Sequence, residues 1–200
     1  MRRGFKAAAE RHAADLRKAV DCSEYETIDL PRVARYLQVA VLAADKVLGS
    51  LEPLQTLHKE QEGAFSAATF VFHGRTLVVY NPIDLNGCYI TPVEAKRDGR
   101  TRSNIAHECS HLILGHQVRG VQKIAGHSFF TCNVEQEAEA NWLAACMLLP
   151  RRLLLAAAYR GDTDDEIARN QRVTKEMAAF RMNTSGVRMQ AARARASRSR

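Results

Sequence analysis

The sequence predicts an α+β fold that is mainly helical and holds one small β-hairpin. Two β-branched and aromatic runs, 69–72 and 76–80, are separated by the short segment 73–75, a spacing that is typical of a hairpin. Residues 5–20 are rich in Ala, Arg, Lys and Leu, a composition that favours a helix. With 46 % apolar residues in 200, the chain has enough hydrophobic content for the core of one domain.

The remainder of the N-terminal half is predicted as short elements and loops. Pro31 suits the first turn of a short helix over 31–37. The apolar run 39–44 fits either an extension of that helix or a strand, and its periodicity does not decide between them. Residues 49–64 and 82–100 contain several Gly, Pro, Asn or Asp residues, so both stretches are predicted mostly as loops.

A helix over 104–115 is predicted after the second loop. Thr101 or Ser103 can cap its N-terminus, and Gly115 is expected at its C-terminal end. Residues 117–132 are then predicted as a connection.

Further helices are predicted towards the C-terminus. Asn133 followed by Gln136 resembles a capping box, and a long helix should run from there to Pro150. A short helix is expected over 151–159, and two more over 165–183.

The formal net charge of +7 is concentrated at the C-terminal end. No acidic residue follows Glu176, and the basic residues that follow it account for most of the excess. These residues are Arg181, Arg188, Arg193, Arg195, Arg198 and Arg200. We therefore predict a nearly neutral body and a basic, disordered tail over 187–200.

Cysteine and hydropathy patterns exclude several classes of protein. Five scattered cysteines without a C-x-x-C pair predict neither a disulfide framework nor a cysteine-based zinc site. No apolar run of about 18 residues occurs, and the first twenty residues carry charges throughout, so neither a membrane span nor a secretory signal is expected. We expect a cytoplasmic protein with no membrane partner.

The segment His107-Glu-Cys-Ser-His111 carries the clearest chemical signal. Positions four apart lie on one face of a helix, so His107 and His111 can offer two imidazoles to one metal ion. Glu108 lies one step around the helix and can reach a water on that ion. Two His ligands with an adjacent carboxylate base are typical of zinc peptidases.

A catalytic zinc site needs a third protein ligand. The spacing H-E-x-x-H-x-x-G-x-x-H is excluded, because Leu114 and Gln117 occupy its Gly and third His positions. The alternative is a carboxylate on the next long helix. We expect Glu137 as the ligand and Asn141, on the same face, as the acceptor that orients a liganding imidazole. Glu139 lies about 200° around the helix and is predicted to face away.

For the other histidines, Tyr80 and Cys109, the sequence predicts no role as metal ligands. His116 and His127 are predicted to be solvated or packing histidines, although either of them, or Tyr80, could stabilise a developing oxyanion. Cys109 is expected to pack against the core.

Two separated stretches resemble the ImmA/IrrE family of metallopeptidases. The first is 104–116, with the sequence NIAHECSHLILGH, and the second is 137–150, with the sequence EAEANWLAACMLLP. That family pairs an A-H-E-x-x-H helix with a second helix that begins E-x-x-A-N/D. The strand that ends at 79–82 is also similar to the family's strand before the first helix.

The resemblance implies a zincin-like, gluzincin-type fold and a cytoplasmic zinc endopeptidase, although the ligands also suit manganese. Carried over by position, His107, His111 and Glu137 bind the metal, and Glu108 is the general base towards a zinc-activated water. Relatives occur in phages and mobile elements and typically cleave a helix-turn-helix transcriptional repressor, so such a repressor is the expected substrate. The outer edge of the hairpin 69–80 could pair with an extended substrate.

The C-terminal part suggests an alternative function. Residues 165–183 resemble a helix-turn-helix, with Asn170 in the turn and Thr174 as the cap of the second helix. Together with the arginines that follow, this part could bind nucleic acid electrostatically. The chain would then be a DNA-binding regulatory protein with a structural or degenerate metal site.

The expected organisation has four parts. They are an N-terminal helical segment over 1–30, a metallopeptidase domain over 31–157, a helix-turn-helix-like appendage over 158–186 and the basic tail over 187–200.

Overall fold

The computed structural model describes residues 1–72, 74–116, 120–124, 127–131 and 133–198. The strands are β1 (Ala40–Ala43), β2 (Ala67–Phe72), β3 (Arg75–Tyr80), β4 (Gly120–Ile124) and β5 (His127–Thr131). The helices are α1 (Phe5–Ala19), α2 (Leu30–Tyr36), α3 (Ala44–Leu48), α4 (Glu52–Glu60), α5 (Pro92–Ala95), α6 (Gly99–Ile113), α7 (Val134–Leu148), α8 (Arg151–Arg160), α9 (Asp164–Gln171), α10 (Lys175–Thr184) and α11 (Val187–Arg198). The predicted α+β, mainly helical class is thus confirmed.

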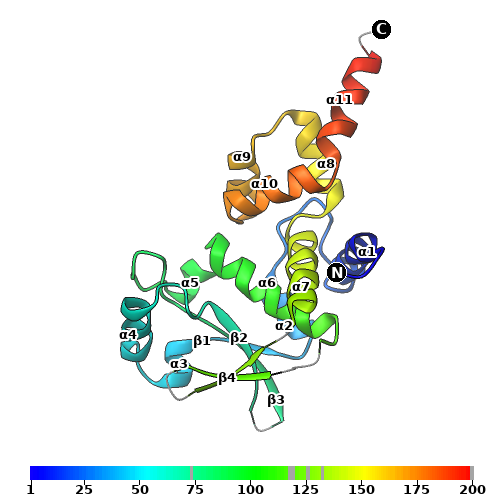
Figure 1. Cartoon of the computed structure of the whole chain (residues 1–200). Helices are drawn as coiled ribbons and strands as arrows, with labels where there is room; N and C mark the ends of the chain where they lie inside the picture. The colour runs from blue at the N-terminus through cyan, green and yellow to red at the C-terminus, as the bar shows by residue number, and fades with distance from the viewer. Residues whose placement is uncertain (73, 117–119, 125–126, 132, 199–200) are drawn as a thin grey trace.

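Helices α6 and α7 lie side by side at the centre of the molecule (Figure 1). The strands lie on one side of this pair, and helices α8 to α11 lie on the other (Figure 1). The two helices carry small buried side chains at Ala106, Cys109, Ala140 and Ala144. Small side chains allow two helix backbones to approach closely. This close packing is what brings the polar faces of both helices to one place.

The main sheet has the strand order β1-β3-β2. The predicted hairpin is confirmed: β2 and β3 are antiparallel, with Thr69 opposite Val78. The run 39–44 forms a strand, because Ala40–Ala43 pairs in parallel with β3 and places Ala43 in the core. Strand β2 is the edge of this sheet next to α6.

Two buried arginines fix the C-terminal end of α7. Arg17 of α1 donates to the carbonyl oxygens of Met147 (3.1 Å) and Leu148 (3.4 Å), and Arg181 of α10 donates to that of Leu149 (2.9 Å). The last carbonyls of a helix lack partners within the helix and carry its negative dipole end, so cations are favourable there. Helices α1 and α10 thereby hold α7 in place.

Both loops predicted before α6 contain helices, so that prediction is wrong in part. Within 49–64, α4 forms with Pro53 in its first turn and Leu54 buried against the sheet. Within 82–100, Thr91 and Glu94 make a capping box that starts α5. The Gly and Pro content of these stretches marks the ends of short helices, and tertiary burial of one or two side chains stabilises them.

The N-terminus of α6 lies earlier than predicted. Asp98 is the N-cap, and its Oδ2 accepts from the backbone N–H of Thr101 at 2.6 Å. Neither Thr101 nor Ser103 is the cap, since both lie inside the helix. The predicted end is confirmed: Gly115 follows the C-cap in the left-handed region, at φ +60°. Within the predicted connection 117–132, the described residues form the antiparallel pair β4–β5.

The C-terminal helices follow the predicted order, with two corrections. The capping box of Asn133 and Gln136 and the cap at Thr174 are confirmed. The left-handed residue between α9 and α10 is Arg172, at φ +53°, and not Asn170.

The predicted disorder of the tail is wrong for residues 187–198, which form α11. Val187 and Ala191 are buried against neighbouring helices, Arg188 pairs with Asp164, and Arg195 donates to the carbonyl of Ala158. Composition alone suggested a solvated tail, but these contacts provide both apolar burial and partners for the charge. Residues 199 and 200 lie outside the described residues.

Within the described residues, no single helix is long and apolar enough to cross a membrane. Helices α7 and α8 meet these two criteria only when taken together, and the pair is bent by 56° between them.

Candidate metal centre

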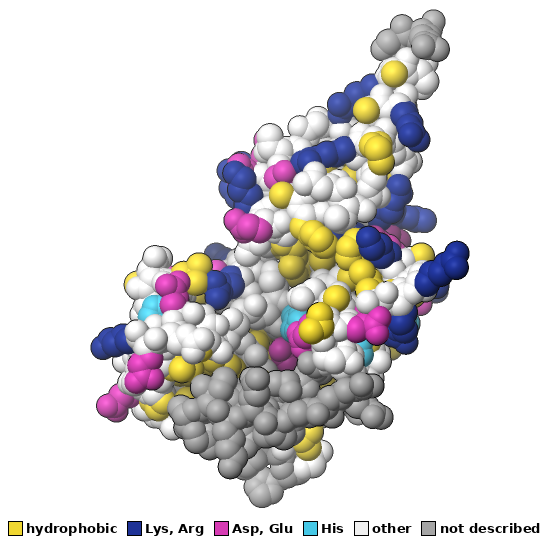
Figure 2. Space-filling view, viewed as in Figure 1, with side chains coloured by type: hydrophobic (Ala, Val, Ile, Leu, Met, Phe, Trp, Pro, Cys, Tyr) yellow, Lys and Arg dark blue, Asp and Glu magenta, His cyan; other side chains and the backbone are white. Residues whose placement is uncertain are grey.

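The local sequences of α6 and α7 place the predicted polar residues on facing surfaces. The four-residue spacing of His107 and His111 puts both imidazoles on one face of α6. The capping box at Asn133 fixes where α7 begins, and Glu137 and Asn141 follow one turn apart on the face towards α6. Figure 2 shows histidine and acidic side chains together in a hollow near the middle of one face of the molecule.

Three potential metal-binding groups converge between these helices. His107 Nε2 lies 2.9 Å from His111 Nε2 and 3.1 Å from Glu137 Oε2, and His111 Nε2 lies 3.6 Å from Glu137 Oε1. One donor atom from each residue lies within 4.8 Å of the other two. The structure therefore brings together the three side chains that the sequence predicted as ligands.

The outward-facing nitrogens of both imidazoles have hydrogen-bond partners. His107 Nδ1 lies 2.9 Å from Asn141 Oδ1, an acceptor, so the proton of a neutral His107 is held on Nδ1. His111 Nδ1 lies 2.9 Å from His116 Nδ1. Burial, together with His107 and His116, lowers the pKa of His111 to about 3, so this imidazole is neutral at pH 7.

These residues fit a divalent metal ion. With Nδ1 protonated in both histidines, their Nε2 lone pairs face each other at 2.9 Å and repel unless a cation lies between them. Zinc–nitrogen bonds of about 2.0–2.1 Å would need only a small increase in this separation. Glu137 completes a set of two neutral donors and one anionic donor, which is the His₂Glu ligation of metallohydrolases.

Glu108 lies beside this cluster and makes a hydrogen bond that the sequence did not predict. Its Oε2 accepts from the hydroxyl of Thr69, on the edge strand β2, at 2.7 Å. Burial raises the pKa of Glu108, while the Thr69 hydrogen bond and His107 act in the opposite direction. The result is a carboxylate in a fixed orientation that can hold a proton more readily than an exposed glutamate.

A second group of polar residues behind His111 was also missed. His116, 5 % exposed, places its Nε2 3.6 Å from Glu139 Oε2. Glu139 is itself 2 % exposed and binds the guanidinium of Arg2 at 2.8 and 3.0 Å, which lowers its pKa to about 2. Glu139 is not among the three groups that converge, in agreement with the prediction that it faces away, and it is buried. No sequence pattern predicted the contact of Glu139 with Arg2, because Arg2 lies at the opposite end of the chain.

The other predicted candidates take different positions. Tyr80 is buried and lines a cavity on the β1 side of α6 together with Ile105. His116 is engaged by His111 as described above, and the side chain of His127 lies outside the described residues. Cys109 is fully buried, as expected, and burial raises the pKa of its thiol to about 12.

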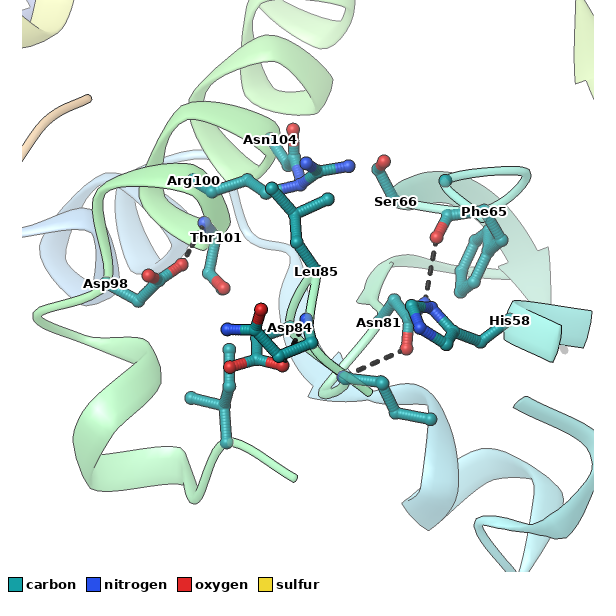
Figure 3. A pocket seen from close by; sticks show the side chains of 14 residues that line it. His58, Phe65, Ser66, Asn81, Asp84, Leu85, Asp98, Arg100, Thr101 and Asn104 are labelled. Carbon is teal, nitrogen blue, oxygen red and sulfur yellow. Dashed lines mark hydrogen bonds between the residues drawn. The ribbon is translucent and has the colours of Figure 1, made fainter. Parts of the chain in front are cut away.

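A pocket of about 210 Å³ opens next to the cluster at the N-terminal end of α6. Figure 3 shows Arg100 and Asn104 of α6 across this pocket from Phe65 and Ser66, which precede β2. Asn104 is one helical turn before Glu108, so this wall of the pocket lies within about one turn of the metal-binding cluster.

A partly buried carboxylate beside two imidazoles and a glutamate, on two packed helices, defines the His₂Glu class of candidate metallopeptidase centre. Residues 93–183 match the peptidase family model described as IrrE N-terminal-like domain. This match supports a metallopeptidase of the ImmA/IrrE family over these residues, and such a family implies a metal ion at this site. No curated protein and no solved structure matches the chain.

The hydrogen bonds to the two imidazoles predict a measurable effect on metal affinity. We expect Asn141→Ala and His116→Ala each to weaken zinc binding about 10- to 100-fold, because each removes the partner that orients a donor nitrogen. Competition with a chromogenic chelator measures this affinity. His12→Ala, at an exposed position of α1, is the matched control and should leave it unchanged. Equal affinities in all three variants would contradict the orienting role.

Proposed function

We propose that this protein is a zinc-dependent endopeptidase with a gluzincin-type centre. His107, His111 and Glu137 would hold the metal ion, and Glu108 would act as the general base. The observation that carries the proposal is the convergence of these donor groups beside a partly buried carboxylate that Thr69 holds through a hydrogen bond. Zinc is favoured by two imidazoles and one carboxylate, although manganese accepts the same donors.

The chain's own residues supply binding, orientation and proton transfer. A bound zinc ion would polarise the peptide carbonyl and lower the pKa of a water molecule. Glu108 would take a proton from that water and pass it to the leaving amine. Thr69 would hold the carboxylate of Glu108 through this exchange, since its hydroxyl donates to Oε2. The raised pKa of Glu108 favours the first half of the exchange, in which the carboxylate takes up the proton.

The substrate would bind in an extended conformation along β2. This strand is an edge of the main sheet, and Thr69 ties it to Glu108, so a peptide paired with β2 would pass the metal centre. The pocket lined by Arg100, Asn104 and Ser66 would then accept one side chain of the peptide. A helix-turn-helix transcriptional repressor is the proposed substrate, by analogy with the family.

The experiment that tests this function uses the repressor encoded beside the gene. We expect the zinc-loaded protein to cleave it, the metal-free protein to leave it intact, and added zinc to restore cleavage. Mass spectrometry of the products identifies the scissile bond. Cleavage at the same rate by the metal-free protein would refute a metal-dependent peptidase.

DNA binding is the alternative, and its basic groups are partly occupied. Lys175 pairs with Asp165 at 3.0 Å, and Arg188 pairs with Asp164 at 2.6 Å. The family match also continues into α10, whose Phe180 makes an edge-to-face ring contact with Trp142 of α7. Both observations favour a structural role for α9 and α10. A gel shift that weakens steeply with salt would instead support nucleic-acid binding through this end.

A further inference from the structure

A second, larger cavity lies on the β1 side of α6. Its volume is about 620 Å³, which is within the range of small-molecule sites. Residues of α2, β1, α5 and α6 form its walls, together with Arg172 between α9 and α10. The apolar lining includes the buried side chains of Ile28, Leu30, Ala34, Tyr80, Ala95 and Ile105.

The polar lining of this cavity is strongly basic. Four cationic side chains, Arg35, Lys96, Arg102 and Arg172, line it, whereas its one acidic residue is Asp29. Asp29 is directed to another cation, since its Oδ2 lies 3.8 Å from Arg32. In the part of the chain that the structure describes, none of the four cations has a carboxylate within ion-pair distance.

Arg102 makes this excess of charge unusual, because its side chain is buried. It is 4 % exposed and donates only to backbone carbonyls: those of Arg172 (2.9 Å), Ile28 (3.0 Å) and Lys96 (3.4 Å). Carbonyl groups solvate a guanidinium but leave its charge uncompensated, and a buried charge without a counter-ion is costly. Burial, with Arg172 nearby, lowers the pKa of Arg102 to about 10.

The backbone conformation of Arg172, which is hydrogen-bonded to Arg102, also contributes to this cavity. Arg172, whose carbonyl accepts from Arg102, has a left-handed conformation at φ +53°, which is uncommon for a residue with a long side chain. This conformation ends α9 and directs the α9–α10 turn to the rim of the cavity. The turn thus adds another cation to a cavity that already has an excess of positive charge.

We propose that this cavity binds a small organic anion with an apolar body, whose acidic group lies among Arg35, Lys96, Arg102 and Arg172 and whose apolar part contacts the buried lining. A guanidinium suits a carboxylate or a phosphate ester, because both offer paired oxygens. The occupant would contact Arg102 and Ile105, which lie on a face of α6 directed away from His107. The proposal concerns binding at this cavity and does not depend on the proposed peptidase function.

Calorimetric titration of the full-length, zinc-loaded protein tests this site, with decanoate below its micellar concentration as the probe. We expect decanoate to bind with one site per chain and decanol, its uncharged analogue, to bind at least tenfold more weakly. Lys96→Glu should weaken decanoate binding at least tenfold, because it removes one cation and adds an anion at the rim. Arg97→Glu makes the same charge change at the next, exposed position, outside the cavity, and should change the affinity less than twofold.

Three outcomes would overturn the proposal. Equal binding of decanoate and decanol, or equal losses in Lys96→Glu and Arg97→Glu, would show that the cavity does not recognise the charge. Loss of binding in His111→Ala would place the carboxylate on the metal ion instead. We expect His111→Ala, which removes a proposed metal ligand, to bind decanoate like the unmodified protein.

Discussion

Glu108→Gln is expected to reduce the cleavage rate about 10²- to 10⁴-fold, the usual contribution of a general base, while zinc affinity changes little. The amide keeps the shape of the side chain and can still contact Thr69, but it cannot take a proton. Glu108 is not one of the three groups that converge as metal donors, so its substitution leaves the donor set intact. Rates measured with the neighbouring-gene repressor, together with the zinc content of the purified protein, check both parts.

Glu176→Gln provides the matched control for this substitution. Glu176 is exposed on α10, and its substitution removes the same charge at a distance from the site. The cleavage rate of this variant should therefore equal that of the unmodified protein. A Glu108→Gln protein that retains zinc and still cleaves at the normal rate would exclude Glu108 as the base. Loss of zinc together with activity would instead assign Glu108 to metal binding.

Arg17→Met is expected to lower the free energy of unfolding by about 3 kcal/mol or more, since several buried carbonyls lose their donor. Arg17 is 1 % exposed and also donates to the carbonyls of Ser23 (2.6 Å) and Glu26 (2.9 Å). Methionine retains most of the apolar stem, so the change in the free energy of unfolding reports mainly the loss of the guanidinium. Chemical denaturation monitored by circular dichroism measures the change.

Lys18→Met makes the equivalent change at the neighbouring, exposed position of α1. Its effect should stay within about 0.5 kcal/mol, as for surface substitutions in general. If the two variants unfold at the same denaturant concentration, the end of α7 does not depend on Arg17. The metal affinity of Arg17→Met should also fall, because α7 carries Glu137 and Asn141.

Local rules predicted the elements that depend on neighbouring residues. The four-residue spacing of His107 and His111, the capping box at Asn133 and the left-handed Gly115 involve residues within one or two helical turns. Such signals depend little on tertiary context, and the corresponding helices form, although α6 begins at Gly99, earlier than the predicted residue 104. The cap of α6 is an exception, because Asp98 takes that position, whereas the sequence favoured Thr101 or Ser103.

Long-range contacts account for the predictions that were wrong or missing. The helix α11 depends on burial of Val187 and on acceptors in α8 and α9, which composition does not show. The hydrogen bond between Thr69 and Glu108 joins residues 39 positions apart, and that between Arg2 and Glu139 joins residues 137 apart. A single sequence has no pattern that links such positions.

The sequence by itself determined which donor groups are available and which face of each helix carries them. Helix periodicity fixes this, because His107 with His111 and Glu137 with Asn141 are each one turn apart. Only the tertiary structure decided that the two faces meet, that Thr69 and His116 orient the groups within, and that a basic cavity lies behind α6. The physical reason is that burial and close packing select partners by distance in space, and residues far apart in the chain then determine each other's charge and orientation.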